Sequence, residues 1–158
     1  MRTPRGLCPQ SSHMYMCELE RCPLCNGYLS LSGYSSGHKI VQTAFSVQKI
    51  GYRPKQCDNP GCPNHGKKWC SAEWQQIAPL YCTYGFDVIA MIGWQRQTEH
   101  RSFGRIYSDL CSRLVISETH VRHLYTYRYL PLLASHERAH WEELRRVSEE
   151  TGLILTDL

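Results

Sequence analysis

Paired cysteines are the residues in this sequence best suited to chemistry. Cys22 and Cys25 are separated by two residues and followed by Asn-Gly, a turn tight enough for both sulfurs to face one ion. Cys57 and Cys62 form a second pair within a turn rich in Pro and Gly. Four thiolates around zinc give a closed tetrahedral site, which stabilises a fold and leaves no open position for catalysis. We therefore predict a structural Zn²⁺ bound by Cys22, Cys25, Cys57 and Cys62.

A second ligand set competes with this one. Cys57, Cys62, His65 and Cys70 also lie close together in the sequence and could form a local zinc knuckle. That arrangement would leave Cys22 and Cys25 without a role. Free buried thiols are the third alternative, so the spacing alone keeps His65 and Cys70 open as ligands.

The cysteine count bears on the compartment. The chain has nine cysteines, and its first residues lack the apolar core of an export signal. We therefore expect reduced thiols rather than a disulfide framework, in a protein of the cytoplasm. No apolar run approaches the roughly 18 residues of a membrane span, so no membrane partner is expected.

The charge is distributed unevenly along the chain. Residues 1–85 carry a net charge of +5, residues 86–130 carry +2, and residues 131–158 carry −3. A basic front with an acidic tail fits an anionic partner for the first two segments.

The elements that would position the cysteines are β-strands. Val41, Thr43, Phe45 and Val47 alternate in a way typical of a strand, and a second short run ends near Pro54. Cysteine turns on either side of β-structure indicate a zinc ribbon over residues 21–70. Residues 1–20 show no clear period and are interpreted as a loose lead-in.

Residues 71–130 have a helical pattern. A short helix is predicted within 71–80, ended by Pro79. Three further short helices are predicted between Phe86 and Tyr129, the second capped by Ser102 and the third by Ser117. Their apolar residues recur at three- and four-residue steps, as expected for one buried face per helix.

Three such helices match the plan of a helix-turn-helix DNA-binding unit. On the third helix, hydrogen-bonding side chains lie opposite the apolar face and could reach base edges in a major groove. These residues are Thr119, Arg122, His123 and Thr126. Arg101 and Arg105, near the start of the second helix, are placed for contacts with the DNA backbone. An ordinary helical hairpin with a polar outer face is the alternative.

Residues 131–158 are predicted to form a charged helix and then a short strand. Pro131 is expected to kink or restart the helix. The final run, Leu153–Leu158, has the apolar character of a strand but no partner strands of its own. The whole chain is thus predicted to be α+β: a small β zinc ribbon, a helix-turn-helix unit and a long C-terminal helix.

The order of these features resembles the N-terminal part of bacterial insertion-sequence transposases of the DDE type. The likeness rests on short stretches around Cys22–Gly27, Arg53–Pro63, Tyr84–Ile89 and Ile116–Val121, and on the closing Leu153–Asp157. It implies sequence-specific binding of double-stranded DNA, at the terminal inverted repeats of a mobile element, by a bacterial protein associated with the nucleoid. Whether the protein forms a homodimer is not decided by its sequence.

The chain departs from that family at the catalytic centre. DDE chemistry needs three carboxylates that hold two divalent ions. Asp157 resembles the first of them, and no partner carboxylates follow, so we expect no enzyme activity from this chain and regard it as truncated before the catalytic domain. Two other functions remain: a transcription regulator derived from such an element, and a zinc-stabilised protein-interaction module that docks through the acidic helix.

Overall fold

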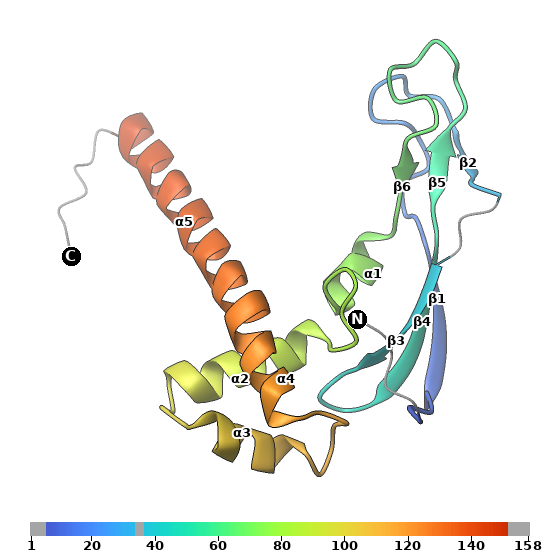
Figure 1. Cartoon of the computed structure of the whole chain (residues 1–158). Coiled ribbons are helices and arrows are strands. Elements are labelled where there is room, and N and C mark those ends of the chain that lie inside the picture. The colour runs from blue at the N-terminus through green and yellow to red at the C-terminus, as the bar shows by residue number, and fades with distance from the viewer. Residues whose placement is uncertain (1–5, 34–36, 152–158) are drawn as a thin grey trace. The chain divides into compact units, whose positions relative to one another are not determined.

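A computed structural model describes residues 6–33 and 37–151. It confirms the α+β class, with small sheets followed by helices that include a long C-terminal one (Figure 1). The chain divides into two compact units: unit 1 comprises Met1–Val88 and Ser112–Val115, and unit 2 comprises Ile89–Cys111 and Ile116–Leu158. The division falls inside helix α2 (Phe86–Gln97), later than the expected domain boundary at residue 70.

One sheet of unit 1 has the strand order β1-β4-β3. Strand β1 (Ser11–Met16) runs parallel to β4 (Val47–Arg53), and β3 (Gly37–Gln42) is antiparallel to it. The expectation that residues 1–20 form only a loose lead-in is therefore wrong. Strand β1 has no alternating apolar pattern to reveal it, because its residues are mostly exposed, and its partner strand lies far along the chain.

The alternation predicted as one strand across residues 41–47 is interrupted by a hairpin turn. Strand β3 ends at Gln42, and the Thr43 N–H and hydroxyl both donate to the Ser46 carbonyl. The hydroxyl of Thr43 also accepts the N–H groups of Phe45 and Ser46. Because this network closes a tight turn, the Phe45 side chain is 93% exposed rather than inside a sheet.

The second sheet of unit 1 surrounds the cysteines. It has the order β2-β5-β6, from β2 (Leu29–Leu31), β5 (Lys55–Cys57) and β6 (Lys68–Trp69). Only Pro54 separates β4 from β5. Because proline has no N–H for a strand ladder, the chain leaves one sheet at this residue and enters the other.

Helix α1 (Ala72–Ile77) begins at Ser71, whose hydroxyl accepts the N–H of Trp74, and ends just before Ala78 and Pro79, as predicted. Trp74 and Ala78 pack with Val41 and Ile50 of the first sheet. This cluster is the apolar core of the sheet and helix part of unit 1.

Unit 2 contains the predicted helices. Helix α3 (Phe103–Leu110) is capped by Ser102, whose hydroxyl accepts the Arg105 N–H, and α4 (Glu118–Leu124) is capped by Ser117, which accepts the His120 N–H. Both predicted caps are confirmed. Three aromatic residues on the predicted apolar faces are only half-buried: Phe86, Phe103 and Tyr125. The aliphatic residues on those faces are buried, none more than 2% exposed: Ile89, Ile92, Ile106, Leu110, Val121 and Leu124.

Helix α4 continues through a widened turn into the long helix α5 (Leu130–Thr151). The five residues Tyr125–Tyr129 form a π-helical segment, η1, in which the Leu130 N–H donates to the Tyr125 carbonyl five residues earlier. Pro131 lacks the N–H of a regular helix, and the widened turn directly precedes it. The chain therefore passes Pro131 without a break in the helix. A Cβ atom on Gly93 of α2 would overlap the ring of Tyr129, the last residue of η1. The absence of a side chain at Gly93 therefore lets η1 pack closely against α2.

The predicted strand Leu153–Leu158, including Asp157, lies outside the described residues. Among the described residues, 6–33 and 37–151, no helix is both long and apolar enough to cross a membrane.

Candidate functional site

The four cysteines predicted as metal ligands come together in unit 1. The ligand sulfurs of Cys22, Cys25, Cys57 and Cys62 all lie within 4.8 Å of one another. The Cys22 and Cys62 sulfurs are 3.9 Å apart, and those of Cys25 and Cys57 are 3.7 Å apart. A metal ion with four thiolates at about 2.3 Å in tetrahedral geometry requires sulfurs about 3.8 Å apart. The cluster is therefore compatible with a metal site.

The competing ligand set does not assemble. Cys57 and Cys62 are in the cluster, whereas His65 and Cys70 are not. His65 is exposed and is linked to Cys57 through a backbone bridge. Spacing could not decide between the sets, because strands β3 and β4 of the other sheet lie between Cys25 and the second pair in the chain.

Backbone amides prepare the sulfurs for negative charge. The Asn64 N–H donates to the Cys62 sulfur at 3.4 Å, and the Asn64 side chain approaches the Cys22 sulfur at 3.9 Å. Asn26 has a φ of 56°, so Asn-Gly after Cys25 does supply the tight turn that its sequence predicted. Amides that point at sulfur stabilise the thiolate, the form that binds metal.

The pKa values of the thiols differ because the sulfurs differ in their hydrogen-bond donors and in their burial. The amides of Cys25 and Leu24 lower the pKa of Cys22 to about 6. The Gly27 amide lowers the pKa of Cys25. Burial raises the pKa of Cys57 to about 12. A cation at the centre would remove the repulsion among the thiolates and allow all four to be ionised.

The cysteines also form the core of their own lobe. Cys22, Cys57 and Cys62 are its buried residues, with Leu29 and Trp69 packed around them. This lobe, defined as β2, β5, β6 and the two cysteine turns (Figure 1), buries no large aliphatic side chain in that cluster. Its stability therefore depends on what joins the sulfurs.

The predicted DNA-facing residues lie on the outer side of α4 and η1 in unit 2. Thr119, Arg122, His123 and Thr126 are all exposed, whereas Val121 and Leu124 on the opposite face are buried. Exposure is required of residues that contact a ligand, but many solvent-facing helices share it. The contact with DNA stays a prediction.

Arg122 is held in place by residues of α3 and α4. Its guanidinium lies 3.6 Å from a Glu118 carboxylate oxygen and 5.1 Å from the ring centre of Phe103. Arg96 lies 5.0 Å from the same ring. The sequence offered no signal for this arrangement, because the spacing of Phe103 with Ile106 and Leu110 is that of a residue on an apolar helix face. Two guanidinium groups on one half-buried ring restrict where Arg122 can reach.

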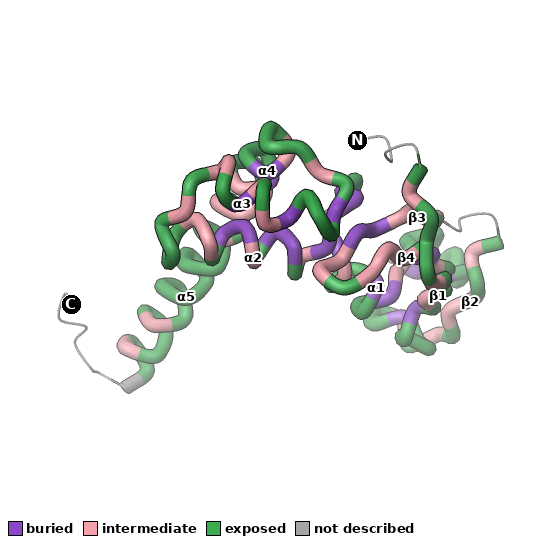
Figure 2. The backbone as a smooth tube through the Cα atoms, turned by 90° about the horizontal axis from the view of Figure 1, so that it is seen from below, coloured by how far each residue is buried: buried purple, intermediate pink, exposed green. Residues whose placement is uncertain are grey.

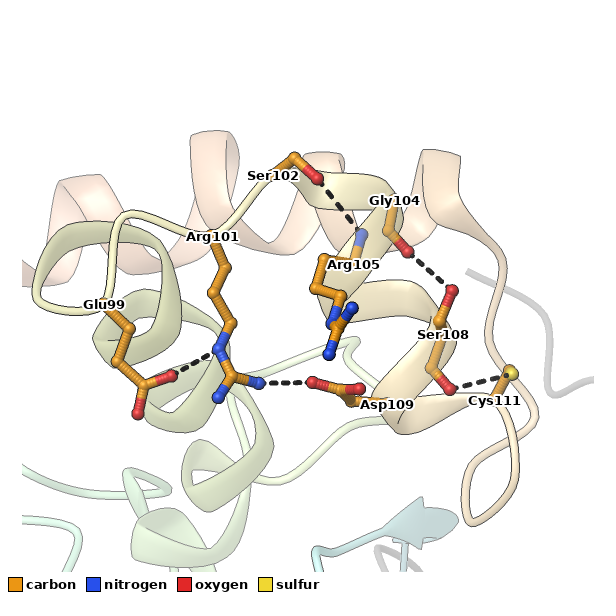
Figure 3. A network of polar contacts seen from close by, with 8 residues as sticks. All are labelled: Glu99, Arg101, Ser102, Gly104, Arg105, Ser108, Asp109 and Cys111. Carbon is orange, nitrogen blue, oxygen red and sulfur yellow. Dashed lines mark hydrogen bonds and ion pairs between the residues drawn. The ribbon is translucent and has the colours of Figure 1, made fainter.

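The two arginines predicted to contact the DNA backbone have different surroundings (Figure 3). Arg101 makes ion pairs with Glu99, at 2.7 Å, and with Asp109. Arg105 is exposed, and the contact drawn for it is the capping bond from its backbone N–H to Ser102. Because Arg101 already has two acidic partners, Arg105 is the better candidate for a phosphate contact.

Comparison of the chain with protein-family models, with curated proteins and with solved structures gives no match. The four-cysteine cluster and the outer face of α4 are thus the features from which a function can be inferred.

Proposed function

We propose that this chain is a zinc-stabilised protein that binds double-stranded DNA sequence-specifically, as the part of a transposase that recognises the ends of a mobile element. The proposal of zinc binding rests on the positions of four sulfurs. Two pairs of them are 3.9 Å and 3.7 Å apart, and all four lie within 4.8 Å of one another. Four thiolates in tetrahedral geometry favour zinc among the common divalent ions. Cys22, Cys25, Cys57 and Cys62 would hold it, and the ion would cross-link the two turns.

The outer face of α4 supports the DNA-binding part of the proposal. A helix backed by buried Val121 and Leu124 presents Arg122, His123 and two threonines to solvent. Arginine reads guanine in the major groove through two hydrogen bonds, and threonine can contact bases or phosphates. The resemblance to DDE transposases adds the class of target, and no catalytic role is proposed for this chain.

The first experiment measures binding of the purified chain to random-sequence duplex DNA by fluorescence anisotropy, from low to moderate salt, with and without a zinc chelator. Micromolar or tighter binding that weakens steeply with salt is expected, because phosphate contacts release counterions. Absence of binding at low salt, with zinc still bound, would contradict the DNA-binding proposal.

The second experiment tests the orientation of α4. A preferred sequence is first selected from a random duplex pool, and Arg122→Ala is then compared with Arg138→Ala, which removes the same charge from an exposed site on α5. We predict that Arg122→Ala costs about 1–3 kcal/mol in binding to the selected sequence. Arg138→Ala should leave that affinity nearly unchanged. Equal effects of the two substitutions would contradict this orientation.

A second candidate function, a protein-interaction module, is favoured by the exposure of α5. Residues 134–143 of this helix are all exposed (Figure 2). Such a module would bind zinc but show no salt-sensitive affinity for DNA, so the first experiment separates the two.

A further inference from the structure

Helix α5 carries apolar side chains that have a coiled-coil spacing, of which three are half-buried and one, Val147, is exposed. Leu130 and Leu133 begin the helix, and Leu144 and Val147 lie near its end. The members of each pair are three positions apart, and the two pairs are fourteen positions apart, which is two heptads. Val147 is 40% exposed, and Trp141, next to this stripe, is 59% exposed. A helix with such a stripe along a polar surface is suited to pairing with another helix.

The centre of the stripe is polar rather than apolar. The same heptad positions are occupied in the middle by Glu137 and His140. Both side chains are exposed. A partner helix must therefore offer apolar groups at both ends and complementary polar groups in the middle.

A second copy of α5 meets this requirement when it runs antiparallel. Residues whose numbers add to 277 then face each other: Leu130 faces Val147, Leu133 faces Leu144, and Glu137 faces His140. Each carboxylate meets an imidazole of the other copy, twice in one dimer. The register is self-complementary, as a two-fold interface requires.

A parallel pair is less favourable. In that arrangement Glu137 faces Glu137, and His140 faces His140, so two like pairs occupy the middle of the interface. Like charges facing each other across helices disfavour that orientation.

We propose that α5 mediates self-association, as an antiparallel pair with α5 of a second copy of this chain, in which Glu137 and His140 face each other across the two-fold axis. The interface is short and carries a polar centre, so association in the micromolar range is expected. The inference concerns α5 alone and does not depend on DNA binding.

The test is sedimentation velocity of the full-length chain without DNA, from low to high micromolar concentration. We expect a concentration-dependent dimer. Glu137→Lys places a lysine against His140, and His140→Glu places a carboxylate against Glu137. Each should raise the dissociation constant of the dimer by about tenfold, since two facing pairs are reversed.

The double variant E137K/H140E distinguishes the orientations. An antiparallel pair regains a lysine facing a glutamate at both sites, so its dissociation constant should return to near that of the unmodified chain. A parallel pair would keep like charges together and would not recover. Glu142→Lys, on the opposite side of the helix, is the control with the same charge change as Glu137→Lys and should leave dimerisation nearly unchanged.

Circular dichroism of every variant checks that α5 stays helical. Monomers throughout the concentration range, with helix content intact, would overturn the proposal and indicate that another segment or another protein covers this face. A dimer insensitive to both single substitutions, or one that the double substitution fails to restore, would overturn the proposed register.

Discussion

The cysteine lobe of unit 1 and the helices of unit 2 are stabilised in different ways. The lobe has three cysteines as its buried core, with Leu29 and Trp69 at the margin. The helical unit buries six aliphatic side chains, none more than 2% exposed, contributed by α2, α3 and α4. A region with so little apolar surface to bury needs a cross-link, whereas the helices can rely on the hydrophobic effect.

The two regions also differ in whether the residues that form the core are the ones proposed to bind a ligand. In the lobe, the groups that bind the ion are also the groups that form the core. In unit 2, the core residues lie on one side of α4 and the exposed polar residues lie on the other. Substitutions should therefore affect one region without the other.

Metal removal should produce the largest difference between the two regions. Binding of structural zinc contributes about 10–16 kcal/mol in small zinc domains, so a chelator or Cys57→Ser should unfold the lobe. Two-dimensional NMR should show loss of the dispersed signals of β2, β5 and β6, with those of α2, α3 and α4 retained. Cys111→Ser, which alters an exposed thiol, is the control and should leave both sets in place. A cysteine lobe that stays folded without metal would remove the basis of the comparison.

The converse substitution is Ile106→Ala in α3. Ile106 is fully buried, and truncation of a buried isoleucine leaves a cavity that costs about 2–5 kcal/mol. Urea unfolding followed by helical circular dichroism should report this loss, while a colorimetric assay finds one zinc still bound per chain. Leu132→Ala, at a residue 43% exposed, should have a much smaller effect. Loss of zinc from the Ile106 variant would show that the regions are coupled.

A smaller effect is expected at the start of α3. Ser102→Ala removes the side-chain oxygen that accepts the Arg105 N–H, which should lower the free energy of unfolding of the helical unit by about 1 kcal/mol. Ser135→Ala, at an exposed site inside α5, is the matched control. If both variants unfold at the same urea concentration, the cap does not contribute as described.

The smallest effect should be a pH dependence in the sheet and helix part of unit 1. The Ser71 hydroxyl, 2.5 Å from the carboxylate, and the Ala72 N–H lower the pKa of Glu18 to about 2. Because this pKa is below the value of an unfolded chain, the stabilisation is present above about pH 4.5 and is lost as the pH falls toward 2.

Acid unfolding of the metal-free chain and of Glu18→Gln, followed by tryptophan fluorescence, measures this contribution. The unmodified chain should lose more stability than the variant over that pH range, since only it has a carboxylate to protonate at this position. Parallel acid curves would exclude a role for Glu18 at the start of α1.

Local patterns were sufficient for much of this fold. The caps at Ser102 and Ser117 follow from short-range sequence signals and are confirmed. The aliphatic residues on the predicted faces of three helices are also buried, whereas the aromatic residues on those faces are half-buried. The cysteine cluster also agreed with the spacing, although the choice between two ligand sets required the path of the chain between the turns.

Other features were missed, some because they depend on distant partners and some because the local pattern was misleading. Strand β1 pairs with residues more than thirty positions away, and nothing in its own sequence indicates that partner. The turn at Thr43 was overlooked because alternation does not reveal that its hydroxyl closes a hairpin. The apolar residues near Cys111 in the sequence favour a buried thiol, but Cys111 is exposed because it lies just beyond the last buried turn of α3. The DNA-facing residues stay a prediction.

The π-helical segment η1 also determines the angle, about the helix axis, between the exposed surface of α4 and the apolar stripe of α5. From Glu118 to Thr151 the chain is one continuous helical rod, and η1 places in it one residue more than an α-helix of the same span would contain. Each residue turns a helix by about 100°, so that extra residue determines the direction in which the Leu133 stripe points relative to Arg122. Deletion of a single residue from Tyr125–Tyr129 would rotate one surface away from the other by about a quarter turn, and leave the sequence of both surfaces unchanged.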